Sequence, residues 1–210
     1  MGDLLLLRHG ESTWNAAGLW QGWYDAPLSG TGQAQAVEAG RALARSGVEP
    51  DLVVSSDLRR ARRTAELVAD QLGYRGDVLV APELREQDVG EWCGLTQEEV
   101  KRWWPEELRA RKVHGVVSMP GGEDADGFVQ RVMTALGAVA GRGAALALVV
   151  AHGGVVAALE RALGLAVGGR SRANLAGWWL QADAGRQPGL RIVRPALPLA
   201  AGEQSVAGPA

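Results

Sequence analysis

The chain has 210 residues, of which 47% are hydrophobic and 22% are charged, and both values are typical of a globular protein of one domain. The net charge of −2 argues against a surface field that gathers nucleic acid or anionic membrane, so we expect neither as a partner. The single cysteine, Cys93, excludes an internal disulfide, and no cluster of cysteines and histidines has the spacing of metal ligands. We therefore expect no metal and no other cofactor.

Six short apolar runs predict β-strands, and five longer segments between them predict helices. The strands are expected at Asp3–Leu7, Leu52–Ser55, Val78–Ala81, Ala145–Ala151, Gly177–Ala182 and Leu190–Arg194. The helices are expected at Thr31–Arg45, Leu58–Leu72, Gln97–Trp104, Asp124–Gly141 and Gly153–Leu163. Ser29 and Thr96 are suited to cap the helices that follow them. This alternation predicts the α/β class, as a three-layer α/β/α sandwich around a mostly parallel central sheet of about six strands.

We expect a single domain over residues 1–195, with a short lid inserted at about residues 94–123. The lid segment departs from the alternating pattern and carries Trp103-Trp104-Pro105 and the basic run Arg109-Ala110-Arg111-Lys112. Residues 196–210 are rich in Ala, Gly and Pro, which predicts a flexible tail. No basic segment precedes a long apolar one at the start, and no run reaches about 18 apolar residues. These features predict a cytoplasmic protein without a membrane partner.

Aromatic and basic side chains gather in the predicted loops and the lid. The tryptophans there either pack the lid onto the domain or stack on a flat part of a substrate, such as a sugar ring. They are Trp14, Trp20, Trp23, Trp92, Trp103 and Trp104. The basic lid residues are interpreted as a solvated face, with contact to a second negative group as the alternative. They are Arg109, Arg111, Lys112 and His114. Trp178-Trp179 fits either the core or a dimer edge, so a homodimer is one alternative for the assembly.

Two predicted strands each run into a histidine followed by glycine. Arg8-His9-Gly10 follows the first strand, and His152-Gly153-Gly154 follows the fourth. In open α/β sheets, ligands bind in the crevice outside the carboxyl ends of the strands. Arg8 beside His9 favours a neutral imidazole, which is the form that a nucleophile needs. Gly153 opens a predicted helix, whose first N–H groups can bind a phosphate.

Hydroxyl and amide donors follow the first histidine. Ser12, Asn15, Gln21 and Gly22 lie within thirteen positions of His9. Donors gathered around a histidine suit an anionic substrate, and these residues are predicted to bind it. The alternative is a polar loop whose side chains bond its own turns.

Two charged clusters leave the choice of functional residue open. Four arginines lie at the start of the second helix, where they oppose the helix dipole and so indicate an anion nearby. They are Arg59, Arg60, Arg62 and Arg63. At most one or two of them can face a common pocket, because neighbouring helical residues point in different directions. Four acids follow the third strand, and one that is held near Trp92 and out of water could act as a general acid. They are Glu83, Glu86, Asp88 and Glu91.

Taken together, these motifs resemble the histidine phosphatase superfamily, also called the phosphoglycerate mutase-like family, over roughly residues 3–182. The matching motifs are Arg8-His9-Gly10-Glu11-Ser12 with Asn15, then Gln21-Gly22, Ser56-Asp57-Leu58-Arg59-Arg60-Ala61 and Leu84-Arg85-Glu86. One position departs from the pattern, because the family often has an arginine two residues before the Gln-Gly pair and this chain has Leu19.

The resemblance implies a role for each core residue. It selects Arg60 among the arginines and Glu86 among the acids. It implies that His9 attacks phosphorus to form a phosphohistidine, while Arg8, Arg60 and His152 hold the phosphoryl oxygens. Glu86 would protonate the leaving oxygen and then activate water, and no metal is required.

Three functions are compatible with such a site. The favoured one is a phosphomonoesterase acting on a small phosphorylated metabolite, either a sugar phosphate or a phosphoglycerate-type ester. The second is a phosphoglycerate mutase, and the third is an inactive phosphate-binding regulatory module. Mutases of this family resemble longer chains, in which a large insertion between the acid and the second histidine encloses the intermediate and excludes water. Hydrolysis is favoured here because Glu86 and His152 are only 66 positions apart, which leaves room for only a short lid. Gln21 also resembles the phosphatase members, whereas mutases usually have threonine there.

Overall fold

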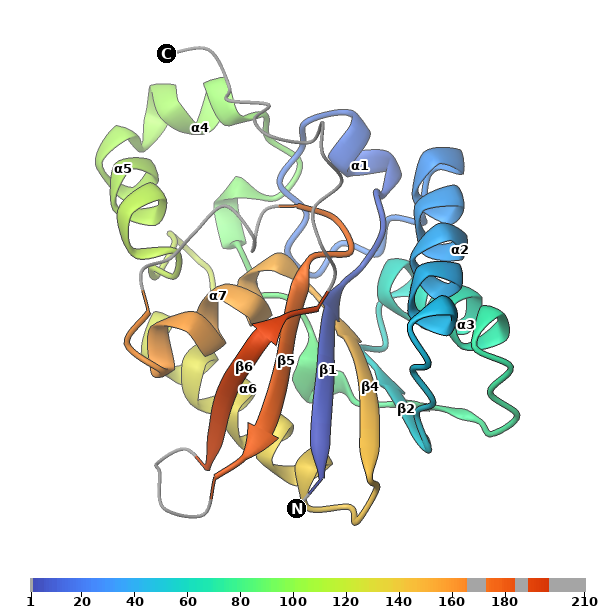
Figure 1. Ribbon diagram of the computed structural model, residues 1–210. Coiled ribbons are helices and arrows are strands. Elements are labelled where there is room, and N and C mark those ends of the chain that lie inside the picture. Colours follow the sequence, from blue (N-terminus) through green and yellow to red (C-terminus); the bar gives the residue numbers. More distant parts are fainter. Residues whose placement is uncertain (1, 166–172, 184–188, 197–210) are drawn as a thin grey trace.

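The computed structural model describes residues 2–165, 173–183 and 189–196 (Figure 1). Apart from Ala196, the predicted tail 196–210 lies outside the described residues. Every predicted strand and helix is found, and each predicted boundary is within one residue of the observed one. Ser29 and Thr96 cap their helices as predicted, since each side chain accepts a hydrogen bond from a backbone N–H of the first turn.

The six strands form one sheet in the order β3-β2-β4-β1-β5-β6. Their bounds are β1 Asp3–Arg8, β2 Leu52–Ser55, β3 Val78–Val80, β4 Leu146–Ala151, β5 Gly177–Ala182 and β6 Leu190–Pro195. The first four strands pair in parallel, and β5 and β6 are antiparallel to their neighbours. The mostly parallel sheet is therefore confirmed.

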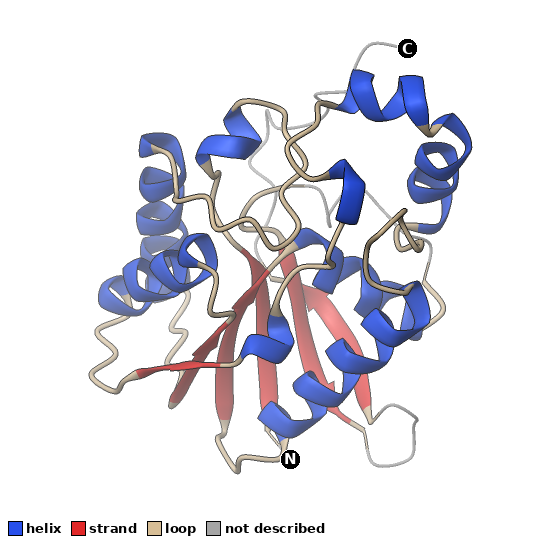
Figure 2. Cartoon of the chain, turned by 180° about the vertical axis from the view of Figure 1, so that it is seen from behind, coloured by secondary structure: helices blue, strands red, loops and turns tan. Residues whose placement is uncertain are grey.

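Helices cover both faces of the sheet, and the side chains of β1 explain why. Successive residues of a strand point to opposite faces. Leu4 and Leu6 are buried with side chains of α6 (Ala125–Ala140) and α7 (Gly153–Ala162). Leu5 and Leu7 are buried on the other face with α2 (Gly30–Arg45) and α3 (Arg59–Gln71). Figures 1 and 2 show the resulting three layers from opposite sides.

The segment 94–123 contains two helices where the sequence predicts one. These are α4 (Gln97–Trp103) and α5 (Pro105–His114). Trp104 leaves the helical conformation (φ −135°, ψ 62°) because it precedes Pro105, and the proline then opens the second helix. The other elements not predicted are short: α1 (Thr13–Ala16) and 3-10 turns at Pro82–Leu84 and Gly90–Trp92.

Tryptophans pack this segment onto the domain. Trp92 is fully buried in a cluster with Val100 and Leu108, and Trp20 and Trp104 pack against the same cluster. Trp103 is 64% exposed. Three of the tryptophans therefore pack as the first alternative predicts, although Trp20 also lines a pocket, and Trp103 is an exception.

Trp178 and Trp179 lie on β5, which is paired on both sides, by β1 and β6. Their indole N–H groups donate to Glu160 (3.0 Å) and to the carbonyl of Ala196 (3.3 Å). These side chains therefore do not form a dimer edge of the sheet. Within the described part of the chain, no helix is long and apolar enough to cross a membrane.

Candidate active site

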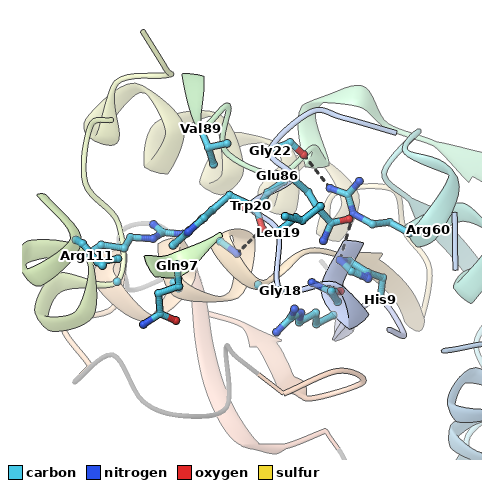
Figure 3. Close-up of a pocket in the computed structure, with 18 of the residues that line it drawn as sticks. His9, Gly18, Leu19, Trp20, Gly22, Arg60, Glu86, Val89, Gln97 and Arg111 are labelled. Carbon is cyan, nitrogen blue, oxygen red and sulfur yellow. Dashed lines mark hydrogen bonds between the residues drawn. The ribbon is translucent and has the colours of Figure 1, made fainter. Parts of the chain in front are cut away.

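A pocket of about 310 Å³ opens at the carboxyl ends of β1 and β4, beneath α5. Eight of the ten predicted site residues line it: Arg8, His9, Asn15, Gln21, Gly22, Arg60, Glu86 and Gly153. Ser12 and His152 are fully buried and are not among the residues that line it. Figure 3 shows His9 and Arg60 together on one side, with Arg111 of α5 on the opposite side.

The pairing of β1 with β4 brings the two histidines together. Arg8 is opposite Ala151 in this parallel pair, so His9 and His152 leave the sheet at the same level. The backbone N–H of His9 donates to the carbonyl of Ala151 at 2.9 Å. The centres of the two imidazole rings are 5.2 Å apart in an edge-to-face arrangement. The pairing of β1 with β4 therefore brings His9 and His152, which are more than 140 residues apart in sequence, into contact through their rings.

The backbone determines which nitrogen of His9 carries the proton. Nδ1 lies 2.6 Å from the carbonyl oxygen of Gly10, which can only accept, so Nδ1 is the protonated atom. Nε2 therefore bears the lone pair, and it accepts a hydrogen bond from Nε of Arg60 at 3.3 Å. Burial, followed by the charges of Arg60 and Arg8, holds the pKa of His9 well below its usual range. His9 is thus a neutral imidazole whose Nε2 electron pair faces Arg60.

Arg60 is the one arginine of its cluster that enters the site. The residue is 1% exposed, and its guanidinium donates to the carbonyl oxygens of Tyr24 and Gly22, both at 2.8 Å. Burial lowers the pKa of Arg60 to about 10, so it remains a cation at neutral pH. Arg62 and Arg63 are exposed and pair with Glu66, and Arg59 is exposed as well. The expectation that most of the cluster is solvated is therefore confirmed.

Glu86 is the one acid of its cluster that lines the pocket. One carboxylate oxygen accepts from the backbone N–H of Gln87 at 2.8 Å, and the other accepts from that of Gly154 at 3.0 Å. Gly154 lies in the first turn of α7, where the helix dipole favours a negative charge. The carboxylate is thus held at a defined position opposite Arg8 and Arg60.

His152 has one nitrogen bonded and one without a partner. Nε2 lies 2.9 Å from the hydroxyl of Ser56. Among the described residues, no atom bonds Nδ1. Burial, followed by the charge of Arg60, holds the pKa of His152 well below its usual range. Buried polar atoms are normally bonded, so a ligand oxygen would satisfy this one.

The predicted donors divide into two groups. Asn15 and Gln21 line the pocket. Ser12, which we predicted to bind substrate, does not line the pocket. Its hydroxyl donates to Oε1 of Gln21 at 2.7 Å and accepts from the N–H of Asn15 at 3.0 Å. Ser12 therefore orients two pocket residues instead of lining the pocket itself.

The structure places two of the basic lid residues and some further residues at the site. Arg111 and Lys112 of α5 line the pocket, together with Leu108 one turn before them. The interpretation as a solvated face is therefore wrong for Arg111, which is half-buried, and right for Arg109, with 73% of its side chain exposed; Lys112 lines the pocket but is exposed to solvent. The spacing from Leu108 marks Arg111 and Lys112 as sharing its face, but the signal needs α5 to be predicted. Asn174 donates to the carbonyl of His9 at 2.9 Å, and no sequence motif pointed to it.

Within the described residues, no group of three or more His, Cys, Asp and Glu side chains could hold a metal ion.

Known proteins match this chain in sequence and in structure. The model of the histidine phosphatase superfamily (branch 1) matches residues 4–178. The 2,3-bisphosphoglycerate-dependent phosphoglycerate mutase of Methylobacterium sp. (strain 4-46) is 38% identical over 132 residues, which is 62% of this chain and 64% of that protein. The mutase of Bartonella tribocorum is 35% identical over 122 residues, 57% of this chain and 59% of that protein. These alignments span about three fifths of each mutase.

Two solved structures cover nearly the whole chain. A mycobacterial glucosyl-3-phosphoglycerate phosphatase complexed with VO3 superposes with a TM-score of 0.75 at 30% identity, over 92% of this chain and 98% of that one. A phosphoglycerate mutase from Thermus thermophilus superposes with a TM-score of 0.67 at 36% identity, over 94% and 99% of the two chains.

Proposed function

The chain belongs to the histidine phosphatase superfamily, and from this we propose that it is a phosphomonoesterase that hydrolyses a small phosphorylated metabolite through a phosphohistidine on His9. The observation that carries the proposal is the neutral imidazole of His9, whose Nε2 electron pair meets a buried Arg60. Glu86 lines the same pocket as a proton donor and acceptor. A complete set of these groups argues against an inactive binding module.

In the first step, Nε2 of His9 attacks phosphorus and forms an N–P bond while the bond from phosphorus to the ester oxygen breaks. Protonated Glu86 gives its proton to the departing oxygen, so a neutral alcohol leaves. Arg8 and Arg60 stabilise the negative charge on the equatorial phosphoryl oxygens. His152 offers its unpartnered Nδ1 to one of these oxygens.

In the second step, water attacks the phosphohistidine. The carboxylate of Glu86 accepts the proton of the attacking water, the N–P bond breaks, and inorganic phosphate leaves. His9 regains its electron pair and Glu86 is protonated again. Asn15, Gln21 and the backbone N–H groups of Gly22 and Gly153 are the further donors that we assign to the phosphate.

The substrate that we propose is a sugar phosphate or a phosphoglycerate-type ester. Arg111 and Lys112 supply positive charge on the side of the pocket away from His9, and this charge suits a second anionic group on the alcohol part of the ester. Trp20 and Leu19 add an apolar wall. The similarity to a glucosyl-3-phosphoglycerate phosphatase supports the same class.

A phosphoglycerate mutase is the second candidate, because the curated relatives carry that name and match at 35–38% identity. The two activities differ in the acceptor of the phosphoryl group. The length of the insertion between Glu86 and His152 does not separate them, since the Thermus thermophilus mutase aligns over 94% of this chain and 99% of its own. We favour water because Gln21 resembles the phosphatase members and because the phosphatase structure superposes with the higher TM-score, 0.75 against 0.67.

One experiment separates the two candidates. The protein is incubated with 3-phosphoglycerate and a priming amount of 2,3-bisphosphoglycerate, and both inorganic phosphate and 2-phosphoglycerate are measured. Release of phosphate is expected to exceed isomerisation, and faster isomerisation would refute the hydrolase. The variant His9→Ala is expected to lose both reactions. Equal activity of His9→Ala and the natural chain would remove His9 as the nucleophile.

A second experiment tests the proposed substrate class. Arg111→Met is expected to raise KM for 3-phosphoglycerate by roughly tenfold, the scale of one lost charge-assisted hydrogen bond. KM for 4-nitrophenyl phosphate, which has no second anionic group of that kind, should change little. Arg109→Met is the matched control, since Arg109 is on the same helix but solvated. Equal KM changes for the two esters would contradict the assignment of Arg111.

A further inference from the structure

Arg131 uses every N–H of its guanidinium within the protein. Nε and Nη2 donate to the two carboxylate oxygens of Glu123, at 2.8 and 2.7 Å. Nη1 donates to the carbonyls of Glu83 (2.6 Å) and Arg85 (3.1 Å), and Nη2 also donates to that of Glu86 (3.4 Å). A guanidinium has five donors in a fixed plane, and here all five have acceptors. This arrangement can be met by no other side chain.

Three of these acceptors belong to the short segment that carries Glu86. The segment leaves β3 through a 3-10 turn at Pro82–Leu84 and has no strand or helix of its own after that turn. Its carbonyls therefore lack the ladder that holds backbone in regular structure. Arg131, which is on α6, donates to three of them from one fixed point, and the indole N–H of Trp23 also donates to the carbonyl of Glu86, at 2.7 Å.

Glu123 connects the same arginine to the end of the lid. Its own N–H donates to the carbonyl of Asp88 at 3.0 Å, and its carboxylate accepts from the N–H of Asp88 at 3.4 Å. The side chains of Arg131 and Glu123 are 21% and 20% exposed, so solvent screens this pair less than a surface pair. Arg131 and Glu123 therefore hold the backbone on both sides of Glu86: Arg131 bonds the carbonyls of residues 83, 85 and 86, and Glu123 bonds the backbone of Asp88.

The carboxylate of Glu86 depends on this backbone. One oxygen is held by the N–H of Gln87, the next residue, and the other by Gly154 on α7. A shift of the segment moves both the side chain and its first donor relative to His9. Misplacement of a catalytic group by about 1 Å can cost about a hundredfold in rate.

We infer that Arg131 is a positioning residue for the acid Glu86, acting through the backbone carbonyls of residues 83, 85 and 86. The inference rests on the proposed function, in which Glu86 protonates the leaving oxygen. Lysine cannot replace Arg131, because a single ammonium has three donors and no planar fork. The structural alternative is that Arg131 only stabilises the fold, in which case its loss affects all substrates alike.

The test compares two esters of the same shape that differ in their need for an acid. Phenyl phosphate has a poor leaving group that needs a proton, and 4-nitrophenyl phosphate has a good one that does not. The quantity measured is kcat/KM, which reports the steps up to transfer of the phosphoryl group to His9. Arg131→Met is expected to lower it by about a hundredfold for phenyl phosphate and by less than about tenfold for 4-nitrophenyl phosphate. Glu86→Gln should show the same bias, at least as strongly.

Two milder variants and one control accompany these. Arg131→Lys keeps the charge, and Glu123→Gln keeps Arg131 but removes its ion pair. Both should lower kcat/KM more for phenyl phosphate than for 4-nitrophenyl phosphate, to a smaller degree than Arg131→Met. They keep the test valid if Arg131→Met does not fold. Arg161→Met is the matched control, because Arg161 of α7 pairs with Asp126 of α6 at 2.6 Å and donates to the carbonyl of Val116 at 3.4 Å, and neither acceptor belongs to the acid-bearing segment. It should lower both values by the same small factor.

The results for these variants distinguish the positioning role of Arg131 from the role of Glu86 as the acid. If Glu86→Gln shows the bias and the folded Arg131 and Glu123 variants do not, the role of Arg131 is refuted while the proposed function stands. If Glu86→Gln lowers both esters equally, the acid itself is misassigned and the role of Arg131 is refuted with it. A bias in all of these variants, absent from Arg161→Met, supports the inference.

Discussion

Replacement of Gly154 by alanine should remove most of the activity without destabilising the fold. A Cβ at this position would lie 1.9 Å from Oε1 of Glu86, and the three closest atoms are all in the Glu86 carboxyl group. The obstacle is the end of a flexible side chain, so the backbone of α7 need not move. The carboxylate has to move instead, and it loses the hydrogen bond from the Gly154 N–H.

The size of the effect follows from that distance. Ordinary van der Waals contact begins at 3.4 Å, so Oε1 has to retreat by about 1.5 Å. A displacement of about 1 Å can cost about a hundredfold, and loss of general acid–base catalysis costs about 10² to 10⁴. We therefore expect kcat/KM of Gly154→Ala on phenyl phosphate to fall by about 10²-fold or more. The melting temperature should stay the same or rise, because alanine favours a helix over glycine by up to about 1 kcal/mol.

The control is Gly137→Ala, in the last turn of α6. A Cβ at Gly137 meets no atom within 4 Å, so this variant gains helix propensity without displacing anything. Both variants are compared by kcat/KM and by thermal unfolding. If Gly154→Ala is as active as Gly137→Ala, Glu86 does not have to occupy its observed position, and the catalytic argument built on that position is wrong. A large loss of melting temperature in Gly154→Ala would show that the backbone, rather than the carboxylate, gives way.

Three further predictions concern stability. Burial and the charge of Arg60 hold the pKa values of His9 and His152 low, so both side chains take up protons on unfolding below a pH of about 6.5. The free energy of unfolding should be at its full value above that pH. Below it, the free energy of unfolding should fall by up to about 1.4 kcal/mol per pH unit for each histidine. Urea unfolding between pH 7 and 5 measures this slope, and a flat profile contradicts it. Gln87→Ala removes a buried amide that donates to two carbonyls of the lid, that of Val117 at 2.8 Å and that of Glu123 at 3.1 Å; limited proteolysis should cut the lid faster, and unchanged cleavage argues against this tether. Trp92→Ala leaves a cavity in the cluster of Trp92, Val100 and Leu108 and should lower the unfolding free energy by about 3–5 kcal/mol. A loss below about 1 kcal/mol would show that the neighbouring side chains fill the space and would contradict this value.

The local elements were readable from the sequence because their causes are local. The leucines of β1, the Ser29 cap and the glycines after both histidines act over a few residues, so their patterns predicted boundaries within one residue. The missed helix α5 has a local cause too, since Pro105 can end one helix and begin another. Pro105 lies in a segment that departs from the alternating pattern of strands and helices, and this hides the helix that it begins.

The members of the site depended on contacts between distant segments. Residue types and spacing left four acids and four arginines open, and only the resemblance to a family selected Glu86 and Arg60. In the structure, Arg60 is the member of its cluster that is buried against Gly22 and Tyr24. Glu86 is the acid that reaches the N-terminus of α7. Neither choice is written in the neighbouring residues, because each depends on which other element packs opposite.

Local sequence patterns predict two strands that are each followed by histidine, helices that alternate with the strands, and a site for an anion. The tertiary structure alone sets the parallel register of β1 beside β4, which brings the ring centres of His9 and His152 within 5.2 Å. It also places Arg111 on the pocket, Ser12 outside its lining and Arg131 beneath the acid. Backbone conformation and side-chain periodicity are properties of a few consecutive residues, whereas register and packing depend on surfaces that meet only when the whole core is buried.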